Sequence, residues 1–131
     1  MKKIKSILMF LVLTFSMSFC SKNVDVISMQ EFQNNILNDK SIVLDVRTEE
    51  EYFGPLGHIN GAILIPIDQL ENRLSELEIY KNDTIYVVCR SGNRSNFGKD
   101  ILNANNFNAI NVDGGMLAWK ADTDELSLIH I

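Results

Sequence analysis

Short apolar runs alternate with amphipathic segments along the chain from residue 24 onward. Five runs are rich in β-branched or other apolar residues and have the length of strands: 24–27, 42–46, 62–65, 84–88 and 109–112. The run 42–46 is apolar except at Asp45, which is typical of a strand buried on both faces. The pattern therefore predicts five short strands.

Helix signals separate the first three of these runs. Ser28 and Thr48 are each followed by a glutamate three positions later, which is the capping-box pattern of a helix start. We expect the first helix to extend to about Asn38. We expect the second to be short, because a loop rich in glycine and proline follows at residues 54–57.

Three more helices are predicted in the second half of the chain. Asp68 and Glu71 favour a helix start, and an apolar stripe accompanies them: Ile67, Leu70, Leu74 and Leu77. Another helix is expected after Gly92, with one apolar face: Phe97, Ile101 and Ala104. The turn at residues 113–115 leads into a terminal helix that we expect to extend through Trp119.

The alternation of strands and helices with short connections predicts an α/β fold. We expect a parallel five-stranded sheet with helices on both faces and an active site beyond the carboxyl ends of the strands. The length of 131 residues fits a single domain, which we place at residues 21–121. Residues 122–131 show no pattern that we can assign.

Composition narrows the possible function classes. The net charge is -5 and no cluster of Lys or Arg occurs beyond residue 5, so the sequence predicts no nucleic-acid partner. Two cysteines cannot form a disulfide framework, and two histidines are too few for a His-rich site, so we expect no metal. The glycine motifs do not resemble a dinucleotide fingerprint, and we expect no cofactor.

Residues 1–20 have the pattern of an export signal. Lysines at positions 2, 3 and 5 precede an apolar run at 7–15, which is too short to span a bilayer. Cys20 follows, and this arrangement resembles a bacterial lipoprotein signal, in which the cysteine becomes the lipid-modified N-terminus. Ordinary cleavage after Ser18 is the alternative. We expect an exported protein, either periplasmic or held through Cys20 on a membrane facing the periplasm or the exterior. Without these residues, nine cations face seventeen acids, a net charge of -8.

The candidate chemistry lies where the strand 84–88 ends. Cys89 follows this strand directly, and a loop containing Gly92 leads into a helix. Glycine allows successive amides to turn inward and form an anion-binding nest, and the helix adds its positive N-terminal end. Both effects favour a thiolate, as do the charges of Arg90 and Arg94. We therefore expect Cys89 to be a reactive nucleophile; the alternative is a buried structural cysteine.

Four segments of the sequence resemble the rhodanese-like family. Residues 89–95, Cys-Arg-Ser-Gly-Asn-Arg-Ser, are similar to the family's active-site loop. Residues 44–47 with 51–52, and residues 57–62, resemble its first two signatures. Residues 113–116 with Ala118 and Trp119 resemble its closing segment. The matches occur in the family's order and extend over roughly residues 24–120, which is the size of a small domain.

This resemblance implies sulfur transfer through a persulfide on Cys89. The sulfur would come from a small anionic donor such as thiosulfate, bound by Arg90 and Arg94. It would pass to cyanide, to an external thiol or to a thioredoxin-like partner, because the chain has no Cys-x-x-Cys motif. The residues implied to bind the donor and stabilise the persulfide are Arg90, Ser91, Gly92, Asn93, Arg94 and Ser95.

Two other functions remain open. One alternative is a phosphatase or an arsenate reductase-like enzyme: some protein phosphatases share this fold and place five residues between cysteine and arginine, whereas four lie between Cys89 and Arg94. The short loop favours sulfur chemistry, although an anion nest holds other oxyanions as well. The third candidate is a non-enzymatic module that binds a partner or senses redox state.

Three polar residues outside the loop are candidate supporting groups. Asp45 interrupts an apolar strand and requires partners, so we expect it to anchor loops close to Arg47. His58 follows a glycine in a loop and is expected to be a hydrogen-bonded brace rather than a base. Trp119 is expected to belong to the core.

Overall fold

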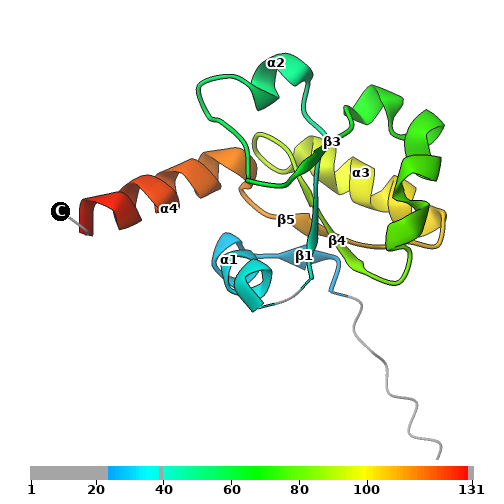
Figure 1. Cartoon of the computed structure of the whole chain (residues 1–131), viewed down its shortest axis with the longest axis horizontal. Coiled ribbons are helices and arrows are strands. Elements are labelled where there is room, and N and C mark those ends of the chain that lie inside the picture. Colours follow the sequence, from blue (N-terminus) through cyan, green and yellow to red (C-terminus); the bar gives the residue numbers. More distant parts are fainter. Residues whose placement is uncertain (1–23, 39, 130–131) are drawn as a thin grey trace, which may run out of the picture.

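The computed structural model describes residues 24–38 and 40–129, in which strands and helices alternate (Figure 1). The strands are β1 (Val26–Ile27), β2 (Ile42–Asp45), β3 (Ile63–Leu64), β4 (Thr84–Val88) and β5 (Asn108–Val112). The α-helices are α1 (Met29–Asn38), α2 (Glu49–Tyr52), α3 (Asn93–Ala104) and α4 (Gly115–Ile129). Two 3-10 helices, η1 (Ile67–Gln69) and η2 (Glu71–Tyr80), connect β3 to β4.

The strands form one five-stranded sheet in the order β1-β5-β4-β2-β3, and every pairing is parallel. The predicted parallel sheet is therefore confirmed. Strand β4 is central, and its Val87 lies beside Leu44 of β2 and Asn111 of β5. This register brings the carboxyl ends of the three strands to one edge of the sheet.

Helices cover both faces of the sheet, as the sequence predicted (Figure 1). On one face, Leu77 of η2 and Leu102 of α3 pack in a cluster with Val87. On the other face, Phe32 of α1 and Met116 of α4 pack in a cluster with Val88, Tyr86 and Val112. Successive residues of β4 thus belong to opposite cores, because side chains alternate across a strand.

The predicted capping residues explain where the first helices begin, with a complete capping box at Thr48 and a hydroxyl cap at Ser28. The Thr48 hydroxyl oxygen accepts from the Glu51 amide at 3.2 Å, and the Glu51 carboxylate accepts from the Thr48 amide at 3.0 Å. At α1, the Ser28 hydroxyl oxygen accepts from the Glu31 amide at 3.2 Å. Each bond satisfies an amide that has no partner within its helix.

Three helix predictions are corrected by the structure. The stripe at 67–77 lies on two 3-10 helices rather than one continuous helix, although Leu70 and Leu77 are fully buried as expected. Phe97 is 60% exposed, because Gly98 and Leu102 occupy the buried face of α3. Helix α4 continues past Trp119 to Ile129, and its C-terminal end projects away from the sheet, where no core-facing periodicity is required (Figure 1).

The predicted export signal and Cys20 lie outside the described residues, so both stay predictions from the sequence. Within the described ranges, no helix is both long enough and apolar enough to cross a membrane.

Candidate active site

Cys89 is the first residue after β4 and lies at the carboxyl edge of the sheet. Its Sγ accepts a hydrogen bond from the Gly92 amide at 3.0 Å and lies 3.2 Å from the hydroxyl oxygen of Ser95. Gly92 has a φ of 116°, a left-handed conformation that favours glycine, and this turn directs its amide at the sulfur. The side chain is only 1% exposed, so the sulfur lies at the bottom of the loop.

Opposing effects determine the ionisation of Cys89. Burial raises the pKa of the thiol and is the largest single cause. Hydrogen bonds from the Ser95 hydroxyl and from the amides of Ser95, Gly92 and Ser91 lower it, and together they outweigh burial. The net pKa is lower than that of an ordinary cysteine, so the buried position does not make the thiol inert.

The start of α4 supports the loop from behind. The amides of Met116 and Leu117 donate to the carbonyl oxygens of Cys89 and Arg90 at 2.8 and 3.1 Å. Gly115 lies so close to these carbonyls that a Cβ at this position would collide with both. The turn at 113–115 and the start of α4 therefore fix the backbone of the nucleophile.

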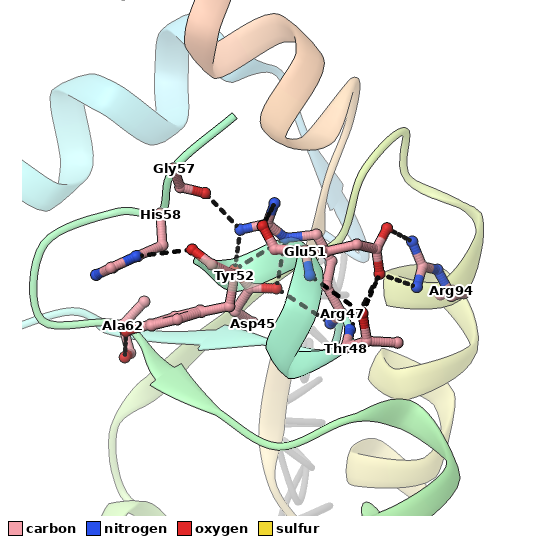
Figure 2. Close-up of polar contacts among 9 residues, drawn as sticks. All are labelled: Asp45, Arg47, Thr48, Glu51, Tyr52, Gly57, His58, Ala62 and Arg94. Carbon is pink, nitrogen blue, oxygen red and sulfur yellow. Dashed lines mark hydrogen bonds and ion pairs between the residues drawn. The ribbon is translucent and has the colours of Figure 1, made fainter. Parts of the chain in front are cut away.

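Arg94, in the first turn of α3, is paired with Glu51 of α2 (Figure 2). Its two terminal nitrogens each donate to a carboxylate oxygen of Glu51 at 2.7 Å. This pair raises the pKa of Arg94 and lowers the pKa of Glu51 to about 2. The hydrogen bond with Arg94 is the largest cause of the low Glu51 pKa. Burial acts in the opposite direction, and hydrogen bonds with Thr48 lower the pKa further. The sequence predicts the capping box of Glu51 but not its pairing with Arg94, because the two residues lie 43 positions apart.

Arg90 differs from Arg94 in having no such partner. It is exposed, and within the described ranges its side chain forms no ion pair. Ser91 and Asn93 are also exposed, and Asn93 begins α3. Arg90 is therefore the main source of uncompensated positive charge in the loop.

Asp45 and Arg47 form a buried ion pair next to the loop (Figure 2). Arg47 Nη2 lies 2.7 Å from an oxygen of Asp45, and Arg47 Nε donates to both oxygens of this carboxylate. Arg47 also donates to the backbone carbonyl oxygens of Glu51 and Gly57, at 3.2 and 2.8 Å. The pair thus ties β2 to α2 and to the loop that follows α2, the anchoring position expected for Asp45.

His58 lies on the outer side of this region. Its ring stacks on Tyr52 with centroids 3.7 Å apart, and its Nδ1 lies 2.9 Å from the Tyr52 carbonyl oxygen (Figure 2). Tyr52 in turn donates from its hydroxyl to the Ala62 carbonyl at 2.9 Å. These contacts are those of a brace for the loop between α2 and β3. Trp119 is partly buried against Phe32 at the edge of the second core.

Asn111, a buried residue of β5, belongs to the site but was not predicted from the sequence. Its Oδ1 accepts from the Ser95 hydroxyl at 2.6 Å, and its Nδ2 donates to the Gly92 carbonyl oxygen at 3.3 Å. An amide within the apolar run 109–112 is the same kind of signal as Asp45 within 42–46, and it was available in the sequence.

Open space flanks the loop on two sides. A pocket of about 350 Å³ is lined by Arg47, Glu51, Pro55, Leu56 and Arg90. A second pocket, of about 430 Å³, lies beside Arg94 and Phe97. Within the described part of the chain, no group of three His, Cys, Asp or Glu side chains is placed to hold a metal ion.

Comparison with known proteins identifies relatives over most of the chain. The family model described as Rhodanese-like domain matches residues 28–122. A putative sulfur carrier protein of Bacillus subtilis, YrkF, is 36% identical over 106 residues, which are 79% of this chain and 55% of YrkF. Thiosulfate sulfurtransferase PspE of Escherichia coli is 34% identical over 73 residues, which are 56% of this chain and 68% of PspE.

Solved structures agree with the fold. The crystal structure of a rhodanese-like domain protein from Staphylococcus aureus superposes with a TM-score of 0.66 at 40% identity and covers 72% of this chain and 90% of its own. The chain spans about half the length of YrkF, and less than a third of a Porphyra purpurea protein named probable molybdopterin-synthase adenylyltransferase that it also matches. The family model matches well over half of the chain and the fold superposes on that of a rhodanese-like domain protein, so the chain belongs to the rhodanese-like domain family.

Proposed function

We propose that this protein is a sulfurtransferase that carries sulfane sulfur as a persulfide on Cys89. The observation that carries the proposal is the contact of Cys89 Sγ with the Gly92 amide at 3.0 Å and with Ser95 at 3.2 Å. Such donors stabilise a sulfur anion, both in the thiolate and in the terminal sulfur of a persulfide. Two of its relatives are named as a sulfur carrier protein and a sulfurtransferase, which supports the same chemistry.

The reaction has two displacement steps. The Cys89 thiolate attacks the outer sulfur of a thiosulfate-type donor, a sulfur–sulfur bond forms, and sulfite leaves with the electron pair of the broken bond. A nucleophilic acceptor then attacks the outer sulfur of the persulfide, and the Cys89 thiolate is released. With cyanide the product is thiocyanate, and with a thiolate the product is a new persulfide.

The surroundings of Cys89 favour a small donor with an anionic end. Only 1% of Cys89 is exposed, so the reacting sulfur has to be a slender terminal atom. The unpaired guanidinium of Arg90 borders the 350 Å³ pocket and can receive the anionic end. A local cation is required there, because the net charge of the chain repels anions at long range.

The acceptor is proposed to come from outside the chain. Cys89 is the free cysteine of the described residues, so no neighbouring thiol can resolve its persulfide there. A small thiol, or a thioredoxin-like protein that presents a thiolate, meets the requirement.

The test is the mass of the intact protein after incubation with thiosulfate. We expect the wild type to gain one sulfur atom and to form thiocyanate when cyanide is added. Cys89→Ser should lose both properties, whereas the matched variant Cys20→Ser should retain them. A wild-type protein that never gains sulfur, or that hydrolyses phosphate esters instead, would contradict the proposal.

Export and lipid anchoring through Cys20 belong to the same proposal. The lysines at positions 2, 3 and 5, the apolar run at 7–15 and the cysteine that follows support it. In a detergent extract of cells that produce the protein, we expect the wild type to partition into the detergent phase. The Cys20→Ala variant should remain in the aqueous phase. Equal partition of both forms would exclude the lipid anchor.

A further inference from the structure

Asn111 contacts two of the residues that hydrogen-bond the Cys89 sulfur, Ser95 and Gly92. Its Oδ1 lies 2.6 Å from the Ser95 hydroxyl oxygen, and its Nδ2 lies 3.3 Å from the Gly92 carbonyl oxygen. The Ser95 hydroxyl and the Gly92 amide in turn reach Cys89 Sγ at 3.2 and 3.0 Å. Cys89, Ser95 and Asn111 are 1%, 0% and 5% exposed, so these contacts form a closed, buried set.

The Gly92 carbonyl determines the orientation of the Asn111 amide. A carbonyl oxygen can only accept, so the amide nitrogen must face Gly92 and Oδ1 must face Ser95. Because Oδ1 also only accepts, the hydrogen between Oδ1 and the Ser95 oxygen belongs to the Ser95 hydroxyl. A separation of 2.6 Å is that of a short O–H···O hydrogen bond.

Ser95 has one hydroxyl hydrogen and two neighbours that compete for it. When Cys89 is a thiol, its S–H donates to Ser95 and Ser95 donates to Asn111, so every group is satisfied. When Cys89 is a thiolate, Sγ and Asn111 Oδ1 both accept, and the single hydrogen cannot serve both. Either the sulfur loses its hydroxyl donor or Oδ1 becomes a buried acceptor without a partner, which is unfavourable.

We propose that Asn111 is a positioning residue that holds the Ser95 hydroxyl hydrogen away from Cys89 and so limits ionisation of the resting thiol. When the thiol proton leaves to solvent, Ser95 turns its hydroxyl to the sulfur and releases Asn111. A thiol that is partly protonated at rest is less open to oxidation. This inference rests on the proposed function for its role, because the thiolate is the nucleophile, but its test requires no sulfur donor.

Charged groups also lie around the loop, and they stay in place when Asn111 is changed. They come from β2, α2, the loop, α3 and the turn after β5: Asp45, Arg47, Glu51, Arg90, Arg94 and Asp113. Two of these form the buried pair of β2, and Glu51 balances Arg94. A change at position 111 therefore reports on the Ser95 hydrogen and not on a change of charge.

The experiment measures the pKa of Cys89 from thiolate absorbance as a function of pH, in the full chain carrying Cys20→Ser so that one thiol remains. We expect Asn111→Leu to lower this pKa by about one unit, a tenfold rise in the ratio of thiolate to thiol. Ser95→Ala should raise it, and Asn111→Leu added to Ser95→Ala should have little further effect. Asn108→Leu, on the exposed start of the same strand, is the matched control.

An unchanged or raised pKa in Asn111→Leu would overturn the inference. An equal lowering with and without Ser95 would also overturn it, because the effect would then not pass through the hydroxyl. If Asn111→Leu does not fold, Asn111→Ala takes its place, since a water molecule can then donate to the Gly92 carbonyl, and the same outcomes decide. Failure of sulfur uptake with a shifted pKa would count against the proposed function alone.

Discussion

Glu51 on α2 clamps Arg94 on α3 through two hydrogen bonds of 2.7 Å, directly beside the loop of the nucleophile. The Glu51 and Arg94 side chains are 29% and 35% exposed, so the pair can open without disturbing a core. The carboxylate neutralises one of the two arginines expected to bind an anionic donor. The pair is therefore an element that limits the affinity of the site for anions.

The first prediction concerns donor binding by Glu51→Gln. Glutamine can retain the capping box with Thr48, but it releases the charge of Arg94. We expect the KM for thiosulfate to fall severalfold at low salt, with kcat changed little, and the gain to shrink as salt screens the charge. Steady-state kinetics with Glu50→Gln as the control measures this. A KM that stays the same, or falls equally in the control, would contradict the clamp.

The second prediction concerns stability in acid. The pKa of Glu51 is about 2 in the folded protein against an ordinary 4.5. The stability that this group contributes is therefore complete above pH 4.5 and is lost as the pH falls from 4.5 toward 2. We expect Glu51→Gln to cost about 1 kcal/mol at neutral pH, as partly exposed pairs do, and to flatten the acid side of the stability curve. Urea unfolding at several pH values tests this. A stability curve of Glu51→Gln that runs parallel to that of the wild type on the acid side would contradict the prediction.

The third prediction concerns the buried pair. Asp45→Asn leaves the Arg47 guanidinium, which is 1% exposed, without its counter-charge. We expect a loss of about 3–5 kcal/mol in the free energy of unfolding, measured with urea. Arg73→Ala, which breaks the exposed pair with Glu76, should cost far less and serves as the control. Equal losses in the two variants would show that burial does not matter here.

The fourth prediction separates backbone strain from site geometry. Gly92→Ala has room for its Cβ, whose nearest neighbour would be 3.6 Å away, but its φ of 116° is unfavourable for alanine. The strain of alanine at this φ is about 1–3 kcal/mol, and we expect the loop to relieve it by moving the amide of residue 92 away from Cys89. The pKa of the Cys89 thiol should then rise, and sulfur uptake should slow more than tenfold. Gly61→Ala, also at positive φ but in open space, should affect stability alone. Normal uptake in Gly92→Ala would contradict this account.

Local signals predicted most of the secondary structure correctly. The helix caps at Ser28 and Thr48 and the β-branched run before Cys89 depend on residues within a few positions of one another, and each lies where expected. The last helix was underestimated because α4 extends beyond the packed part of the molecule, where burial imposes no pattern on the sequence. The sequence predicts Phe97 on one apolar face with Ile101 and Ala104, but Phe97 is exposed while Ile101 is buried, because periodicity does not reveal how much of a helix face meets the sheet.

The sequence by itself determined the α/β alternation, the position of Cys89 at a strand-to-helix turn and the expected need of Asp45 for a partner, since these follow from spacing along one stretch of chain. Only the tertiary structure paired Glu51 with Arg94 and brought Asn111 to Ser95. Those contacts join residues 43 and 16 positions apart and arise because parallel strands bring their carboxyl ends to one edge. The neutralisation of Arg94 and the choice of partner for the Ser95 hydroxyl hydrogen are therefore properties of the folded sheet and not of the loop sequence.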